Sequence, residues 1–175
     1  YWDETARIVG EAPSTLHMIV PECRLGDAEP EPETLWRAMQ KALDTVLTRA
    51  VEGFVLVERQ TDNGCRLGLL AAVDLAAYDY APGATPLIRA TEGTVTSRLP
   101  ARMKVRRGAP LEIPHVLLLA DDPKHTLIEP LYARREALPA LYDFELMQGG
   151  GHIRGWAVTD DRSFAQMDAA LSGLL

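Results

Sequence analysis

Residues 54–74 read FVLVERQTDNGCRLGLLAAVD and indicate the fold most clearly. Two runs rich in apolar residues, 54–60 and 66–74, flank the stretch Thr61-Asp62-Asn63-Gly64. An Asn-Gly pair readily supplies the positive φ angles that a tight hairpin turn needs. Both runs are partly apolar on both faces, which is typical of central strands covered on each side. This stretch therefore predicts an antiparallel hairpin inside a sheet.

A long amphipathic helix is predicted just before this hairpin, over residues 33–50. Pro32 suits the start of a helix, and Gly53 suits a position just beyond its end. We expect the helix to pack on the sheet, with Trp36, Met39 and Leu43 largely buried. The apolar residues that fall on one face at helical spacing are Leu35, Trp36, Met39, Leu43, Val46, Leu47 and Ala50.

Shorter apolar runs predict the remaining elements. Residues 16–20 and 115–120 have the pattern of buried strands, and residues 127–131 are a candidate for another. A short helix is expected at residues 2–9. Asp160 or Asp161 can cap a final helix. The expected core face of that last helix is Phe164, Met167, Leu171, Leu174 and Leu175.

A second hairpin is predicted around Gly149-Gly150-Gly151, between residues 141–147 and 152–158. The three glycines lack the glycine spacing and the Lys-Ser/Thr pair of a phosphate-binding loop, so a turn is favoured. Together these elements predict an α+β fold. We expect a mixed, largely antiparallel sheet with flanking helices, forming a single domain or part of a larger fold over residues 1–175.

Composition narrows the class of protein. The chain has 175 residues, of which 47% are apolar and 25% charged, as expected for a globular domain with a hydrophobic core. The net charge of −7 argues against general binding to nucleic acid or to a membrane surface. Cys23 and Cys65 lie far apart in no metal-ligand spacing, which favours a reducing, cytoplasmic compartment; a single disulfide between them is the alternative. No signal peptide or apolar run long enough to span a membrane is visible.

The most unusual stretch is basic. Arg89-Ala-Thr-Glu-Gly-Thr94 is followed by a run of cations, and no acidic residue occurs between Glu92 and Glu112. Forked guanidinium groups together with hydroxyl and backbone donors are what phosphate or carboxylate recognition requires. The alternative is a solvated basic edge whose arginine stems cover apolar surface. The candidate anion-binding residues are Arg89, Glu92, Thr94, Arg98 and Arg102.

Other polar groups give weaker signals. Asp121-Asp122-Pro123 could hold a divalent metal beside a phosphate, but paired acids before a proline are also ordinary turn formers, and the turn is favoured. Zinc-ligand spacing, a nucleophile elbow and a dinucleotide-binding fingerprint are all missing from the sequence. The sequence therefore names no catalytic residue, no metal site and no cofactor.

An ordered set of motifs covers most of the chain. The motifs are STLHMIVPE at residues 14–22, FVLVERQT at 54–61, LIRATEGT at 87–94, PLEIPH at 110–115, IEPL at 128–131 and LYD at 141–143. In these motifs the chain resembles the domain-of-unknown-function family 1015, a group of uncharacterised bacterial and archaeal proteins. The resemblance implies that members continue with an Asp-Gly-Asn-His or Asp-Gly-His-His motif, which this sequence lacks. Since the sequence opens at Tyr1 without a methionine and closes on apolar residues, we expect it to be the N-terminal portion of something longer.

The absent motif loosely resembles the Gly-x-His-Arg motif of sulfiredoxin-like and ParB-like proteins, some of which bind nucleotides or phosphorylate small molecules. This is an analogy between folds. It leads us to expect binding of a nucleotide or phosphorylated small molecule, and a small-molecule phosphotransferase whose main catalytic motif lies beyond this chain. Arg89, Arg98 and Arg102 would clamp the anion, Glu92 would hold a metal or act as a base, and Thr94 would donate a hydrogen bond. The alternative is a non-catalytic binding or scaffolding domain whose basic stretch meets an acidic partner. The sequence leaves open the oligomeric state and whether the chain is an enzyme.

Overall fold

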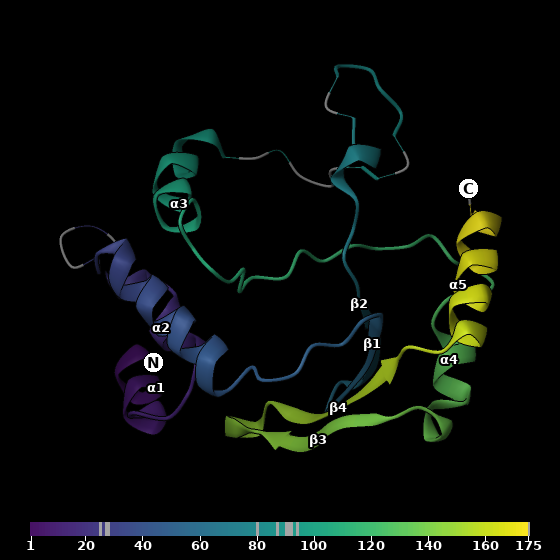
Figure 1. Ribbon diagram of the computed structural model, residues 1–175, viewed down its shortest axis with the longest axis horizontal. Helices are drawn as coiled ribbons and strands as arrows, with labels where there is room; N and C mark the ends of the chain where they lie inside the picture. The colour runs from purple at the N-terminus through teal and green to yellow at the C-terminus, as the bar shows by residue number, and fades with distance from the viewer. Residues whose placement is uncertain are drawn as a thin grey trace. The chain divides into compact units, whose positions relative to one another are not determined.

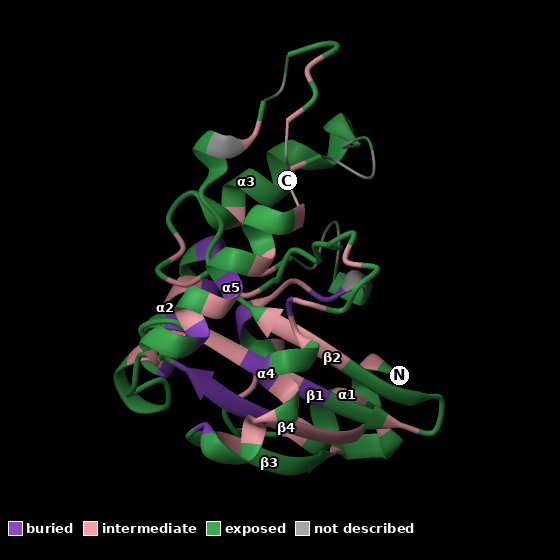
Figure 2. Cartoon of the chain, turned by 90° about the vertical axis from the view of Figure 1, so that its right-hand side faces the viewer, coloured by how far each residue is buried: buried purple, intermediate pink, exposed green. Residues whose placement is uncertain are grey.

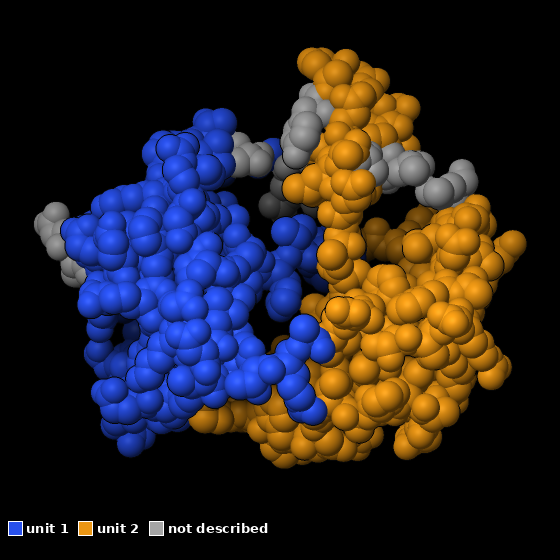
Figure 3. Space-filling model, in the orientation of Figure 1, with its two compact units in different colours: residues 1–50, 92–118 blue, residues 51–91, 119–175 orange. Residues whose placement is uncertain are grey.

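The computed structural model describes residues 1–24, 26, 29–79, 81–86, 88–89, 93 and 95–174. The chain divides into two compact units, each built from two stretches of sequence (Figure 3). Unit 1 comprises Tyr1–Ala50 and Glu92–Leu118, and unit 2 comprises Val51–Thr91 and Leu119–Leu175. The expectation of a single domain, or of part of a larger one, stays a prediction.

Unit 2 contains a four-stranded sheet in which every neighbouring pair of strands is antiparallel (Figure 1). The strands follow the order β2-β1-β4-β3, so β1 and β4 are central and the other two form the edges. The prediction that both strands of the first hairpin are central is therefore wrong for β2, which has only one neighbour in the sheet. The predicted α+β class with a largely antiparallel sheet is therefore confirmed. The strands are β1 (Phe54–Thr61), β2 (Gly64–Leu70), β3 (Ala140–Leu146) and β4 (Gly151–Val158).

The first hairpin pairs β1 with β2 as predicted, but its turn lies one residue earlier than expected. Thr61 pairs with Gly64, so Asp62 and Asn63 occupy the turn. Gly64 carries the positive φ of 119°, whereas Asn63 does not have a positive φ. The turn thus depends on the conformational freedom of the glycine alone. The second strand also ends sooner than predicted, at Leu70, and residues 71–74 are exposed.

The second hairpin, between β3 and β4, is also confirmed. It turns through a short 3-10 segment, η6 (Met147–Gly149), with left-handed backbone at Gln148 and Gly149. Gly151 has a φ of 87°, and a Cβ there would lie 2.0 Å from the carbonyl oxygen of Gln60 on β1. The glycine is therefore required because neighbouring backbone passes too close for a side chain.

Helices of unit 2 cover part of one face of the sheet. These are α4 (Glu129–Ala133) and α5 (Asp161–Leu174), with the 3-10 turn η5 (Arg135–Ala137) after α4. Figure 2 shows the buried end of β4 within this layer. The core there comprises Leu56, Leu127, Leu131, Leu138, Trp156, Val158 and Met167.

The structure agrees with the prediction for the start of α5 and differs from the prediction for the residues of α4. Asp160 caps α5 as expected, because its Oδ1 accepts a hydrogen bond of 2.9 Å from the Ser163 amide. Met167 is buried, and Phe164 and Leu174 are half-buried, whereas Leu171 is exposed. Leu175 lies outside the described residues. The strand predicted at residues 127–131 is wrong, since α4 begins there. Pro130 lies in the first turn of this helix, where its missing N–H is tolerated.

Unit 1 is helical. The predicted helix at residues 2–9 is confirmed as α1. The long predicted helix is present as α2, but it ends at Thr45 and not at residue 50. Met39 is buried, while Trp36 and Leu43 are half-buried. The elements are α1 (Trp2–Val9), η1 (Thr15–Met18), η2 (Glu22–Arg24), α2 (Pro32–Thr45), η4 (Thr96–Arg98) and α3 (Leu99–Arg106); η3 (Leu75–Ala77) belongs to unit 2.

The core of unit 1 lies along α2. Its buried residues are Met18, Leu35, Met39 and Ala42, and half-buried residues such as Val105 and Leu111 pack against them. Since α2 belongs to unit 1 and the sheet to unit 2, the packing of this helix on the sheet stays a prediction.

Two predicted buried strands are wrong. Residues 16–20 begin with η1, which the Ser14 side chain caps by accepting a hydrogen bond of 3.2 Å from the Leu16 amide. Residues 115–120 form neither helix nor strand, and Val116, Leu117 and Leu119 are each more than 80% exposed. A compact apolar run indicates a buried strand only where another strand is present to pair with it.

Candidate functional site

The predicted basic stretch forms a helical segment in unit 1, where η4 leads directly into α3. Pro100 occupies the first turn of α3, a position that tolerates proline. Trp36 of α2 holds the other end of the helix, because its indole N–H donates a hydrogen bond of 2.6 Å to the Val105 carbonyl. All the cations of this segment are exposed: Arg98, Arg102, Lys104, Arg106 and Arg107.

Most of these cations lack a carboxylate partner. Arg106 forms an ion pair with Glu112, with 3.2 Å between Nη2 and Oε1. The side chains of the other four cations form no ion pair and no hydrogen bond with any described residue. Mutual repulsion of neighbouring cations is therefore left largely uncompensated along the helix.

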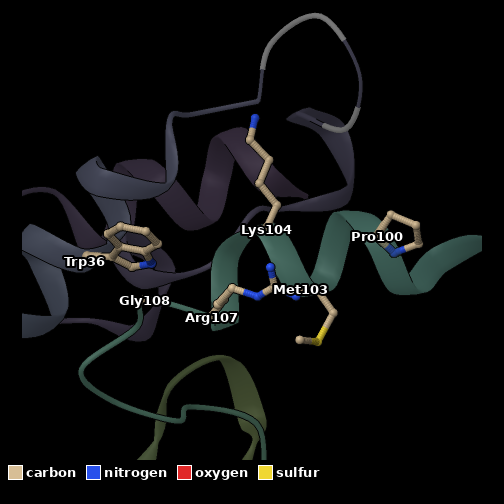
Figure 4. Close-up of a pocket in the computed structure, with 6 residues that line it drawn as sticks. All are labelled: Trp36, Pro100, Met103, Lys104, Arg107 and Gly108. Atoms are coloured by element: carbon tan, nitrogen blue, oxygen red, sulfur yellow. The ribbon is translucent and has the colours of Figure 1, made fainter.

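The basic residues divide between two sides of α3. Arg98, Arg102 and Arg106 follow one another at four-residue spacing, which places them on one side of a helix. Lys104 and Arg107 lie on the other side, next to an open hollow of about 450 Å³ (Figure 4). We call this feature the Trp36 hollow. Its lining residues are Trp36, Pro100, Met103, Lys104, Arg107 and Gly108.

Of the other three predicted anion-binding residues, the structure describes one. Arg89 belongs to unit 2, is exposed, and donates from Nε to the Pro86 carbonyl at 3.2 Å. Glu92 and Thr94 lie outside the described residues. The convergence of Arg89, Glu92, Thr94, Arg98 and Arg102 on one surface therefore stays a prediction.

A second polar cluster, which we did not predict, crosses the sheet of unit 2. We call it the sheet-face network. Glu58 is buried on β1, accepts a hydrogen bond from the Tyr132 hydroxyl on α4, and lies 3.3 Å from Arg154 Nη1 on β4. Arg154 Nε lies 3.5 Å from Asp143 Oδ2 on β3. The network thus links α4 to three adjacent strands.

His152 extends this network to the turn end of the sheet. Its Nδ1 lies 2.6 Å from Glu145 Oε1, and its Nε2 contacts Asp143 Oδ1. Hydrogen bonds to Glu145 and Asp143 raise the pKa of His152. Since each carboxylate engages a different ring nitrogen, the arrangement favours the doubly protonated imidazolium.

The sheet-face network is a row of ion pairs and hydrogen bonds whose role is structural. The hydrogen bond to Glu58 and burial raise the pKa of Tyr132, so its hydroxyl stays protonated and is a poor nucleophile. The signal in the sequence was a spacing of two along the strands, which puts Glu58 on the same face as the core residue Leu56 and Arg154 on the same face as His152. Residues two apart share one face of a strand.

The described residues give no metal site, because no group of three His, Cys, Asp or Glu side chains among them could hold an ion. Asp122 opens a turn through Pro123 and Lys124, closed by a hydrogen bond of 3.1 Å from the His125 amide to the Asp122 carbonyl, so the turn favoured from the sequence is present. Asp122 accepts hydrogen bonds from the Leu127 amide at 2.8 Å and from the Thr126 hydroxyl at 3.0 Å. Cys23 and Cys65 are free and exposed. No helix in the described ranges is long and apolar enough to cross a bilayer.

Comparison with known proteins identifies the family. The family described as "Protein of unknown function (DUF1015)" matches residues 1–174. The chain belongs to the DUF1015 family. This match confirms the resemblance inferred from the sequence motifs. No curated protein and no solved structure matches this DUF1015 chain.

Proposed function

We propose that this DUF1015 chain binds a phosphate-containing small molecule, a nucleotide or a phosphorylated metabolite, on α3. The observation that carries the proposal is the set of exposed cations of η4 and α3 that lack a described carboxylate partner, in a chain of net charge −7. Ordinary surfaces mix charges of both signs. A bound anion would offset the repulsion that this segment otherwise retains.

A small molecule is favoured over nucleic acid for reasons of charge. Tracking a nucleic-acid backbone requires a broad positive surface, which an acidic protein with one short basic helix does not offer. One or two phosphate groups need only a few forked donors. Arg98 and Arg102, one helical turn apart, suit this task.

The proposal retains the remaining predicted residues as further ligands. Arg89 would supply a third guanidinium, Thr94 a hydroxyl donor, and Glu92 a metal ligand or a base. Transfer of a phosphoryl group depends mainly on positioning and on neutralising charge, so such a site suits a small-molecule phosphotransferase. The free cysteines support a reducing compartment, and we propose a cytoplasmic location on that basis.

A non-catalytic scaffolding role is the competing proposal. It is favoured by the exposure of Arg98 and Arg102, which do not line the Trp36 hollow. An acidic protein surface could cover such a stripe as readily as a phosphate could.

Calorimetric titration of the chain with pyrophosphate at low salt tests the small-molecule proposal. We expect binding that weakens as salt is added, because exposed charge interactions are screened. Arg98→Ala with Arg102→Ala should remove most of it while the circular dichroism spectrum is unchanged. The matched control is Arg66→Ala with Arg162→Ala, which removes two exposed arginines from unit 2 for the same change in net charge. Equal affinity in the two double variants would refute the proposal, and absence of binding to the unmodified chain would favour the scaffold.

A further inference from the structure

We infer that the Trp36 hollow receives the flat ring of a nucleotide. The hollow lies on the side of α3 that faces away from Arg98 and Arg102, so this inference adds a second site to the proposed phosphate site and names its class of ligand. The hollow combines two kinds of lining. Trp36, Pro100 and Met103 supply apolar surface, and Lys104 and Arg107 supply positive charge. A nucleotide has the same two parts, a flat base and an anionic phosphate chain.

The Trp36 side chain forms one side of the hollow and is held in a fixed position. Its ring is held by the hydrogen bond from the indole N–H to Val105 and by packing on the core of unit 1. Gly108 lies so close to the ring that a Cβ there would stand 2.5 Å from it. Backbone therefore approaches the ring on that side. An aromatic side chain fixed in this way is the usual platform for stacking a base.

The opposite part of the hollow is apolar and open. Met103 is 44% exposed, and Pro100 lies at the far end of α3 from Trp36 (Figure 4). Exposed methionine is a soft contact that adapts to flat ligands. An inorganic anion would gain nothing from these side chains, whereas a base would cover them.

The two cations place the phosphate chain beside the ring. Arg107 is adjacent to Gly108, at the end of the hollow near Trp36, and Lys104 lies one turn earlier in α3. Neither side chain forms an ion pair with a described residue. Both can therefore turn to an anion without breaking an existing contact.

The test compares adenosine diphosphate with pyrophosphate on the 175-residue chain, by calorimetric titration at low salt. Stacking on one aromatic ring should make adenosine diphosphate bind about tenfold tighter or more. Met103→Glu, which introduces a carboxylate at an exposed position, should weaken adenosine diphosphate binding about tenfold. Met147→Glu is the matched control, since Met147 is 66% exposed and lies in unit 2. It should change the affinity less than about twofold.

The outcomes separate the two proposals. Equal affinity for the two ligands, with Met103→Glu no different from Met147→Glu, would overturn the nucleotide inference. Phosphate binding through Arg98 and Arg102 would still stand in that case. Failure of both ligands to bind would overturn both proposals. Lys104→Ala with Arg107→Ala provides a further check. Because these two cations line the hollow, we expect this double variant to lose at least as much nucleotide affinity as Met103→Glu loses.

Discussion

The hydroxyl group of Tyr132 on α4 donates a hydrogen bond to the buried carboxylate of Glu58 on β1, 74 residues away in the sequence. Glu58 is the only charged residue among the buried residues described, and Arg154 is its other partner. A buried carboxylate is tolerated only when its oxygens are satisfied. The contact therefore ties α4 to the sheet through a buried polar group.

Tyr132→Phe removes this donor and keeps the ring. We expect the free energy of unfolding to fall by about 1–3 kcal/mol, the usual penalty for an unsatisfied buried acceptor. Urea denaturation measures the change. Tyr142→Phe is the matched control, because Tyr142 is half-buried and its hydroxyl has no hydrogen bond to a described residue. A loss no larger in Tyr132→Phe than in Tyr142→Phe would show that the contact contributes nothing to stability.

Gly155→Ala should destabilise the β3–β4 hairpin. A Cβ at this position would lie 2.2 Å from the ring of Tyr142, so the ring would have to leave its place over β4. Overpacking of this kind costs about 1–3 kcal/mol. Gly68→Ala, in the edge strand β2, is the control, because a Cβ there meets nothing within 4 Å. Thermal unfolding of both variants should show a clear fall in Tm only for Gly155→Ala.

Asp160→Ala should shorten or loosen the start of α5. The side chain accepts hydrogen bonds from the amide and the hydroxyl of Ser163, and loss of such a cap costs about 1 kcal/mol. Asp168→Ala, at an exposed mid-helix position, removes the same charge and should be close to neutral. Chemical denaturation distinguishes them. Equal effects in the two variants would mean that net charge and not capping is responsible.

Stability should also depend on pH through His152. Because Glu145 and Asp143 raise its pKa in the folded state, this contribution is fully present below the unfolded value of about 6.5 and is lost as pH rises through the folded value. His152→Gln should remove that part of the pH profile. Proton NMR should find the imidazole of His152 titrating above the ordinary pKa of histidine. An ordinary pKa for His152, or an unchanged profile in the variant, would contradict the arrangement.

Both hairpins could be predicted because their signals are local. Asn63-Gly64 and the three glycines at 149–151 mark turns whatever the rest of the chain does. Pro130 argues against the strand predicted at residues 127–131, since proline cannot donate in a central ladder. Asp122 instead orders the chain that precedes α4, because its side chain accepts a hydrogen bond from the Leu127 amide.

Other features could not be predicted because they depend on distant pairing. Residues 115–120 have the composition of a buried strand, yet burial requires a neighbour that composition does not name. The sheet-face network depends on the register of three strands, which brings Glu58 opposite Arg154 and Arg154 opposite Asp143. Each residue alone is unremarkable in the sequence. The basic character of α3 was visible, whereas its division between two sides and the role of Trp36, 69 residues from Val105, were not.

The interleaved make-up of the two units constrains how the protein can be assembled and dissected. Since the unit boundaries fall after Ala50, Thr91 and Leu118, the polypeptide passes between the units three times. The ribosome must therefore synthesise α3 before unit 1 is complete. By then it has already synthesised the first hairpin of unit 2, but not β4, the strand that pairs with it. Joining such separated segments carries a loop-closure cost and slows folding. Neither unit can be produced by cutting the gene at one point, and isolating either one requires joining its two segments by a new linker.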